Sequence, residues 1–106
     1  MKPENLYTLP IWDKKDEFVE TILKTKSLRV ERIISSGHTS ENGFWYCQEE
    51  NELVFLLQGE AKIEFSDGSI VSQKAGDYIN IEKEVKHRVA YTSKEPEAIW
   101  LAVFYQ

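Results

Sequence analysis

The chain from residue 27 to residue 105 is a series of short apolar runs separated by residues that favour turns. Within the runs, β-branched and aromatic residues are frequent and often alternate with polar residues, which is typical of strands with one buried face. We predict eight strands, over residues 28–35, 43–48, 52–57, 61–65, 70–73, 78–81, 86–92 and 99–105. Many short strands at close spacing favour a sandwich or a barrel.

The clearest local signal in this region is the pair Asp67-Gly68. It separates two of the predicted strands, and glycine tolerates the positive φ that tight hairpin turns require. We therefore expect the two flanking strands to pair as a β-hairpin.

The first part of the chain has a different pattern. Pro3 and Pro10 favour an extended segment, and four apolar residues after them fall on one helical stripe. The stripe consists of Phe18, Val19, Ile22 and Leu23. Asp13 has the position and the side chain of an N-cap. We therefore predict one short amphipathic helix over residues 14–25, packed across a face of the sheet.

Length and composition fit one domain. With 106 residues, of which 42% are hydrophobic, the chain has enough apolar surface for one core without disulfides or a metal. We predict a single domain over residues 1–106, with the extended segment and helix in residues 1–26 and a barrel in residues 27–105. The predicted fold class is mainly all-β, a small β-barrel or jelly roll with one short N-terminal helix.

The formal net charge of −5 argues against a surface for nucleic acid or for an anionic membrane, because such surfaces need clustered Lys and Arg. No apolar run approaches the roughly 20 residues of a membrane-spanning helix. The single cysteine, Cys47, cannot form an internal disulfide, and the opening stretch is polar and contains proline, unlike a signal peptide. We therefore expect a cytoplasmic protein.

The apolar run at residues 99–105 would be sticky if it were exposed. It is either a buried central strand or a contact between subunits. The second alternative makes a homodimer a reasonable expectation.

Glu52 directly precedes the apolar run of residues 53–57. If Glu52 begins that strand, the period of two places it on the same face as Val54 and Leu56, which in a barrel is the interior. A carboxylate there needs a partner, such as a cation, a metal or hydrogen-bond donors. The alternative is that Glu52 lies just outside the barrel in solvent.

His87 poses the same question in the predicted strand over residues 86–92. Its charged neighbours along the strand are expected on the outer face, while His87 shares the other face with Val89 and Tyr91. An inward imidazole can bind a metal or hydrogen-bond a carboxylate, although a lone inward histidine is more often a core residue with satisfied hydrogen bonds. The other histidine, His38, is expected in a loop away from this position.

At these two residues the sequence resembles the cupin superfamily, which has two motifs separated by a variable stretch. The second half of the first motif, E-x6-G, matches Glu52 and Gly59. The second motif, G-x5-P-x-G-x2-H-x3-N, matches at Gly76 and His87. Its Pro, Gly and Asn positions hold Glu82, Glu84 and Tyr91. The resemblance covers roughly residues 28–105 and implies a cupin-type barrel with its site at the mouth.

In metal-binding cupins, two histidines of the first motif, its glutamate and the histidine of the second motif form the metal set. Neither first-motif histidine is present here: one spacing puts Tyr46 and Gln48 at those positions, and the other gives Trp45 and Cys47. The resemblance therefore implies a ligand pocket of Tyr46, Gln48, Glu52 and His87, of which Gln48, Glu52 and His87 would hold a divalent Fe, Mn or Zn ion, or no metal at all. A turn at residues 49–51 would break the shared strand face that this set assumes.

Two functions fit such a pocket. The first is a metal-dependent enzyme with oxygenase or isomerase chemistry on a small molecule, in which Tyr46 donates a proton or hydrogen bond. The second is a metal-free barrel that binds or senses a small molecule, in which Glu52 pairs directly with His87 and raises the pKa of the histidine. Its apolar lining would come from Phe44, Trp45, Tyr46 and Phe55. A third interpretation, a structural or partner-binding domain, leaves His87 without a role.

Overall fold

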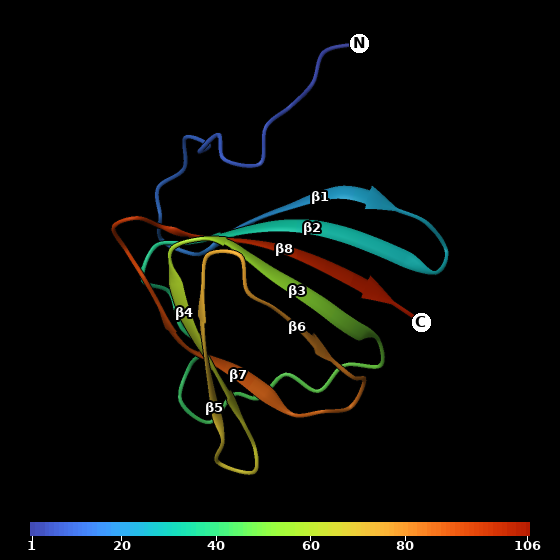
Figure 1. The fold of residues 1–106 in the computed structure, drawn as a ribbon, viewed down its shortest axis with the longest axis vertical. Helices are drawn as coiled ribbons and strands as arrows, with labels where there is room; N and C mark the ends of the chain where they lie inside the picture. Colours follow the sequence, from blue (N-terminus) through green and yellow to red (C-terminus); the bar gives the residue numbers. More distant parts are fainter.

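Two antiparallel sheets make up the fold in the computed structural model, which describes residues 1–106 (Figure 1). The strands are β1 (Phe18–Lys24), β2 (Leu28–Ser35), β3 (Asn51–Gln58), β4 (Glu60–Phe65), β5 (Ile70–Lys74), β6 (Tyr78–Ile81), β7 (His87–Thr92) and β8 (Ala98–Tyr105). The larger sheet has the strand order β1-β2-β8-β3-β6, and the smaller one has the order β5-β4-β7. The all-β prediction is confirmed, and the fold is the barrel-like arrangement that many short strands indicate.

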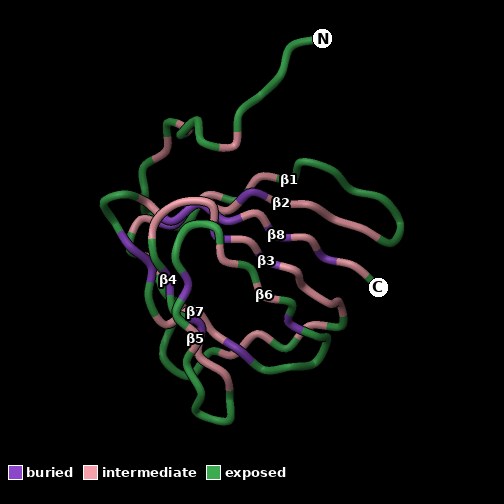
Figure 2. Tube along the Cα trace, viewed as in Figure 1, coloured by how far each residue is buried: buried purple, intermediate pink, exposed green.

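The core lies between the two sheets, along the inner faces of β8, β3 and β4 (Figure 2). Its main cluster consists of Val54, Leu56, Ala61, Ile63, Ile81, Ala98, Trp100, Ala102 and Phe104. β8 lies between β2 and β3 and pairs with both along its length. The apolar run at residues 99–105 is therefore a buried central strand, the first of the two alternatives for it, and the homodimer stays a prediction.

The predicted helix over residues 14–25 is wrong: the structure contains no helix, and most of this segment is the edge strand β1. β1 pairs with β2 from Phe18 to Lys24, with a register shift between Thr21 and Leu23. At this shift Ile22 is an extra residue without a partner in β2. The apolar residues of β1 therefore do not follow the strict alternation of a regular strand, and their spacing in the sequence resembles that of a helix. Pairing with β2 outweighs the weak local preference for a helix.

Asp13 stabilises a turn and is not the N-cap of a helix. Its Oδ1 atom accepts a hydrogen bond from the backbone N–H of Lys15 at 2.9 Å, two residues later. The same side-chain chemistry that suits an N-cap also suits such an Asx turn. The sequence signal was therefore real, but it marks a turn before β1.

The predicted strand over residues 43–48 is also wrong. This segment meets β7 at one bridge only, where the backbone N–H of Tyr46 donates to the His87 carbonyl at 2.7 Å and the N–H of His87 donates back at 3.1 Å. A turn closed by the Phe44 N–H on the Glu41 carbonyl, at 3.0 Å, interrupts the pairing before Tyr46. The segment is thus a loop along the edge of β7, and β1 takes its place in the count of eight strands.

The hairpin predicted at Asp67-Gly68 is confirmed as β4 and β5. Gly68 has a φ of 92°, and the Asp67 Oδ1 atom accepts hydrogen bonds from the backbone N–H and the hydroxyl of Ser69 at 2.8 and 2.6 Å. The turn residues therefore act as the pattern indicates.

The N-terminal segment leaves the sheets and runs along their outside (Figure 1). It is held by the buried Arg32 of β2, whose guanidinium donates to the carbonyls of Leu6 and Thr8 at 3.1 and 2.6 Å and lies 3.0 Å from Glu20. The segment therefore covers an outer face and does not contribute to the barrel interior. No helix of the length and apolarity needed to cross a membrane is present.

Candidate functional site

A cavity of about 360 Å³ lies between the two sheets. Its apolar lining comes from Val19, Ile33, Tyr46, Val54, Ile63, Ile81, Val89, Trp100 and Phe104. Its polar lining comes from Glu17, Arg29, Glu31, Gln48, Glu52 and His87. This volume is at the small end of the range for ligand pockets, about 300–1,000 Å³, and the mixture of a broad apolar wall with a few polar groups is typical of them.

Glu52 and His87 face each other in this cavity from β3 and β7. The Glu52 Oε1 and His87 Nε2 atoms lie 3.5 Å apart, and the side chains are only 13% and 7% exposed. Glu52, the second residue of β3, points inward because it lies on the same face as the buried residues Val54 and Leu56. The strand period that placed both side chains inside was therefore correct.

The His87 ring is fixed from two further directions. Its Nδ1 atom lies 2.9 Å from the Val85 carbonyl, and the Tyr46 ring stacks on it with centroids 5.5 Å apart. Burial lowers the pKa of His87, but the Glu52 carboxylate and the Val85 carbonyl outweigh burial, so this pKa lies above its usual value. The Glu52 carboxylate and the Val85 carbonyl thus both favour the protonated form of the ring.

Tyr46 and Gln48 reach the cavity from the loop beside β7, so all four predicted site residues line one cavity. Burial raises the pKa of the Tyr46 phenol, and the charges of Glu17 and Glu52 raise it further. Gln48 is held through its backbone, since its carbonyl accepts a hydrogen bond from the Glu84 N–H at 2.7 Å. The turn anticipated at residues 49–51 exists at Glu49 and Glu50, before β3 begins. The binding role of the four residues stays a prediction.

Several neighbouring expectations are wrong. Tyr91 does not share the inner face with His87 and Val89, because a register shift between β4 and β7 adds Ala90 to the strand and turns Tyr91 outward, 43% exposed. The aromatic side chains of Phe44, Trp45 and Phe55 do not line the cavity.

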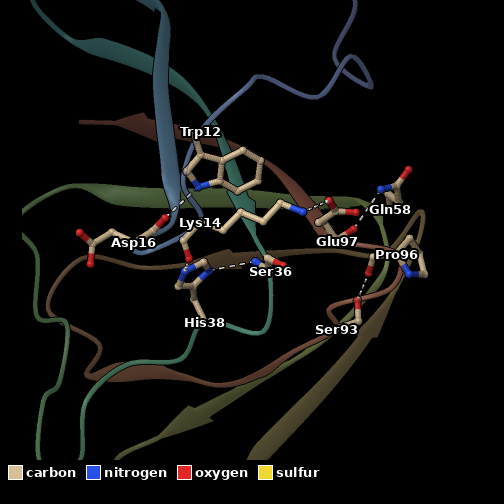
Figure 3. Close-up of polar contacts among 9 residues, drawn as sticks. All are labelled: Trp12, Lys14, Asp16, Ser36, His38, Gln58, Ser93, Pro96 and Glu97. Atoms are coloured by element: carbon tan, nitrogen blue, oxygen red, sulfur yellow. Dashed lines mark hydrogen bonds and ion pairs between the residues drawn. The ribbon is translucent and has the colours of Figure 1, made fainter.

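His38 does not line this cavity, as expected for a loop residue. Its Nδ1 atom accepts a hydrogen bond from the Ser36 N–H at 2.9 Å, and its Nε2 atom lies 2.9 Å from the Lys14 carbonyl. Beside it, the Lys14 ammonium lies 3.5 Å from Glu97 (Figure 3). His38 therefore joins the turn before β1 to the loop after β2.

Sequence reasoning missed the charged residues that β1 and β2 contribute. Arg29 lies 3.0 Å from Glu31 and 3.0 Å from Glu50, and its guanidinium stacks 4.1 Å above the Phe104 ring. Glu17 directly precedes β1 and accepts a hydrogen bond from the Ser35 hydroxyl at 3.3 Å. Arg29, Glu31 and Glu17 lie outside both motifs, and Glu17 fell in the predicted helix, so no pattern connected them with Glu52.

The predicted metal set offers a carboxylate oxygen from Glu52, an imidazole nitrogen from His87 and an amide oxygen from Gln48. The Val85 carbonyl directs His87 Nε2 toward Glu52, an arrangement often found for a metal-binding histidine. Two ligands of a tetrahedral ion lie roughly 3.4 Å apart, and the observed separation is 3.5 Å. The donor chemistry therefore fits a divalent ion, although nowhere do three or more His, Cys, Asp or Glu side chains converge.

Comparison with known proteins identifies the family and the fold of the chain. The cupin domain model matches residues 34–104. A protein of Ralstonia eutropha JMP134 whose name is "putative mannose-6-phosphate isomerase" is 34% identical, with a TM-score of 0.93 over 100% of this chain and 99% of its own. Among curated proteins, none matches significantly.

Two more distant structures share the fold alone. The EutQ protein of Clostridium difficile is 20% identical, with a TM-score of 0.69 over 84% of this chain and 67% of its own. A cupin superfamily protein of Desulfitobacterium hafniense DCB-2 is 15% identical, with a TM-score of 0.81 over 98% and 90%. The matching domain model and the likeness to the Ralstonia protein show that the chain belongs to the cupin family.

Proposed function

We propose that this protein binds a small organic molecule in the barrel cavity and that the Glu52–His87 pair fixes the polar group of that molecule. One observation carries the proposal: the pair lies in the same 360 Å³ cavity as an apolar wall. Such a cavity removes the apolar part of a ligand from water and leaves one place where its polar group finds partners.

The two side chains offer complementary chemistry. Glu52 accepts hydrogen bonds, and a protonated His87 donates from Nε2 on the same side of the cavity. A ligand hydroxyl placed between them would accept from His87 and donate to Glu52, whereas a ligand ammonium would donate to Glu52 alone; such charge-assisted hydrogen bonds are stronger than neutral ones. The apolar wall around Trp100 and Val54 would add about 0.8 kcal/mol for each ligand methylene that it takes out of water.

The proposal is tested by titrating the protein with benzyl alcohol and benzylamine, two small probes with one ring and one polar group. The NMR signals of the methyl groups of Val54, Ile63 and Val89 would report binding. We expect saturable shifts in the wild type, an affinity for both probes lower by about tenfold or more in Glu52→Gln, and the same loss for benzyl alcohol in His87→Asn, because a hydrogen bond to a charged group contributes about 1.5–3 kcal/mol.

Glu49→Gln is the matched control, since this exposed carboxylate is near Glu52 in the chain but outside the cavity. It should leave the affinity unchanged. Equal affinity in the control, the wild type and both site variants would refute the role of the pair.

A second candidate function is a metal-dependent enzyme, and the donor set of Gln48, Glu52 and His87 favours it. A divalent ion held there would act as a Lewis acid on a ligand oxygen, which suits isomerase or oxygenase chemistry. The name of the Ralstonia protein supports the isomerase alternative. In this function Tyr46 lies beside His87 and would donate a hydrogen bond or proton to the ligand.

Metal analysis separates the two functions. The enzyme hypothesis predicts roughly one metal ion per purified chain, its loss in Glu52→Ala, and loss of ligand binding after treatment with a chelator. The binding hypothesis predicts probe affinities that the chelator does not change. Stoichiometric metal together with chelator-sensitive binding would favour the enzyme.

A further inference from the structure

Among the charged groups that line the cavity, acidic groups outnumber basic ones. They are Glu17, Arg29, Glu31, Glu52 and His87. Three of them are carboxylates, while the basic groups are one guanidinium and one imidazole. The pairing of each basic group therefore decides which charge the cavity presents to a ligand.

The positive charge of Arg29 is already balanced. Its guanidinium lies 3.0 Å from Glu31 and 3.0 Å from Glu50, and it stacks on Phe104 at 4.1 Å. An anionic ligand would therefore meet a guanidinium whose charge two carboxylates already offset. The other basic group, His87, faces Glu52 and carries at most one charge against that carboxylate.

Glu17 forms no ion pair, although the imidazole of His38 lies near enough for its charge to act on the carboxylate. The only side-chain hydrogen bond of Glu17 comes from the neutral hydroxyl of Ser35, at 3.3 Å. Burial raises the pKa of Glu17, and the nearby charges of Asp16 and Glu31 act in the same direction, while Ser35 and His38 oppose them. A positive charge in the cavity would stabilise the ionised form of this carboxylate.

The two carboxylates approach the cavity from different elements. Glu17 comes from the start of β1 and Glu52 from the start of β3, and the negative charges of both act on the phenol of Tyr46. A ligand beside Tyr46 therefore experiences a negative potential from both carboxylates. The aromatic rings of Tyr46 and Trp100 also line the cavity, and aromatic faces attract cations.

We propose that the ligand of this cavity is an organic cation, an ammonium group on a small apolar body, and that Glu17 selects for its charge. This inference rests on the small-molecule binding proposed above. A phosphorylated or carboxylated ligand would meet three carboxylates, with the one guanidinium already paired. The cavity thus discriminates against the kind of substrate that the name of the Ralstonia protein mentions.

A panel of probes with the same ring tests this selectivity: benzylamine, benzyl alcohol, benzoate and benzyl phosphate, each titrated at about pH 7, where the amine is protonated. We expect benzylamine to bind at least about fivefold more tightly than benzyl alcohol, and both anions more weakly than the alcohol. Glu17→Gln should remove most of the amine preference and leave the affinity for the alcohol unchanged. The matched control Glu49→Gln should keep the wild-type preference.

The possible results are distinguishable. If no probe produces saturable shifts, both the proposed function and this inference are overturned. If the alcohol or an anion binds as tightly as the amine, the cavity binds small molecules but does not select cations, and only this inference is overturned. If Glu17→Gln weakens all probes equally, Glu17 has a structural role and its assignment to selectivity is wrong.

Discussion

His87 is held by three neighbouring groups. The Val85 carbonyl holds one ring nitrogen, the Tyr46 ring covers a face, and the Glu52 carboxylate lies opposite the other nitrogen. A protonated ring satisfies the carbonyl and the carboxylate at once, whereas a neutral ring donates to only one of them. The surroundings of His87 therefore favour its charged form in the metal-free protein.

In metal-free protein, we expect the pKa of His87 to lie above 6.5 and to fall in Glu52→Gln, because the variant removes the carboxylate that favours the charged form. An NMR pH titration of the imidazole signals measures both values. The raised pKa also fixes the sign for stability: the pair stabilises the fold fully below about pH 6.5, and this contribution is lost as the pH rises through the folded-state pKa. A pKa at or below 6.5, or one that Glu52→Gln leaves unchanged, would contradict this account.

At the scale of residues, the sequence predicted the pair but not its surroundings. Glu52 and His87 were predictable because each lies at the start of a strand whose alternation is regular next to them. Tyr91 was not, because the extra residue Ala90 reverses the alternation and nothing in the local sequence marks it. The place of Glu17 near Tyr46 was not predictable either, because it depends on the pairing of β1 with β2, which the local sequence does not show.

At the scale of elements, β1 shows why one segment was mispredicted. Its apolar residues repeat as they would on a helix, yet the segment is an edge strand in which Ile22 is an extra residue. The remaining predicted strands, apart from residues 43–48, agree with the structure because their hydrophobic alternation and their turns point to the same answer.

Gly59 joins β3 to β4 in a conformation that only glycine adopts easily. Its φ is 84°, and an added Cβ would lie 2.5 Å from Ser93 Oγ and 2.9 Å from the Glu97 carbonyl oxygen. The nearby hydrogen bond from the Ser93 hydroxyl to the Pro96 carbonyl, at 2.7 Å, makes this crowded loop hard to move (Figure 3). Steric crowding therefore explains why the first motif has a glycine at this position.

We expect Gly59→Ala to lower the free energy of unfolding more than Gly68→Ala does. Both variants place alanine at positive φ, which costs about 1–2 kcal/mol. The Cβ at Gly68 would meet open space, while the overpacking at Gly59 adds about 1–3 kcal/mol. Urea denaturation of the two variants measures the difference, and equal free energies would show that the loop around Gly59 yields without strain.

At the scale of the whole molecule, the two sheets provide the apolar wall, and the loop beside β7 provides Tyr46 and Gln48. The family and the barrel-like fold were predictable from motif spacing and strand pattern. The size and the charges of the cavity were not predictable from the sequence, because they depend on the long-range placement of the edge strand β1 and of this loop.

The homodimer remains a prediction for the assembled molecule. Since β8 is internal, the contact surface is expected on the edge strand β1, where Ile22 and Leu23 are exposed. Sedimentation equilibrium should give twice the monomer mass for the wild type and the monomer mass for Leu23→Lys. A monomeric wild type would rule out this assembly, and a dimeric Leu23→Lys would move the contact elsewhere.

The most direct test of the account is the titration of chelator-treated, metal-free protein with benzylamine, followed through the methyl signals of Val54, Ile63 and Val89. All three residues line the cavity that contains Glu52 and His87. If the Glu52–His87 pair holds the ligand, the methyl groups shift saturably without metal, and the affinity is about tenfold or more lower in Glu52→Gln. Shifts that appear only after a divalent metal is restored, or no saturable shifts at all, would contradict this role of the pair.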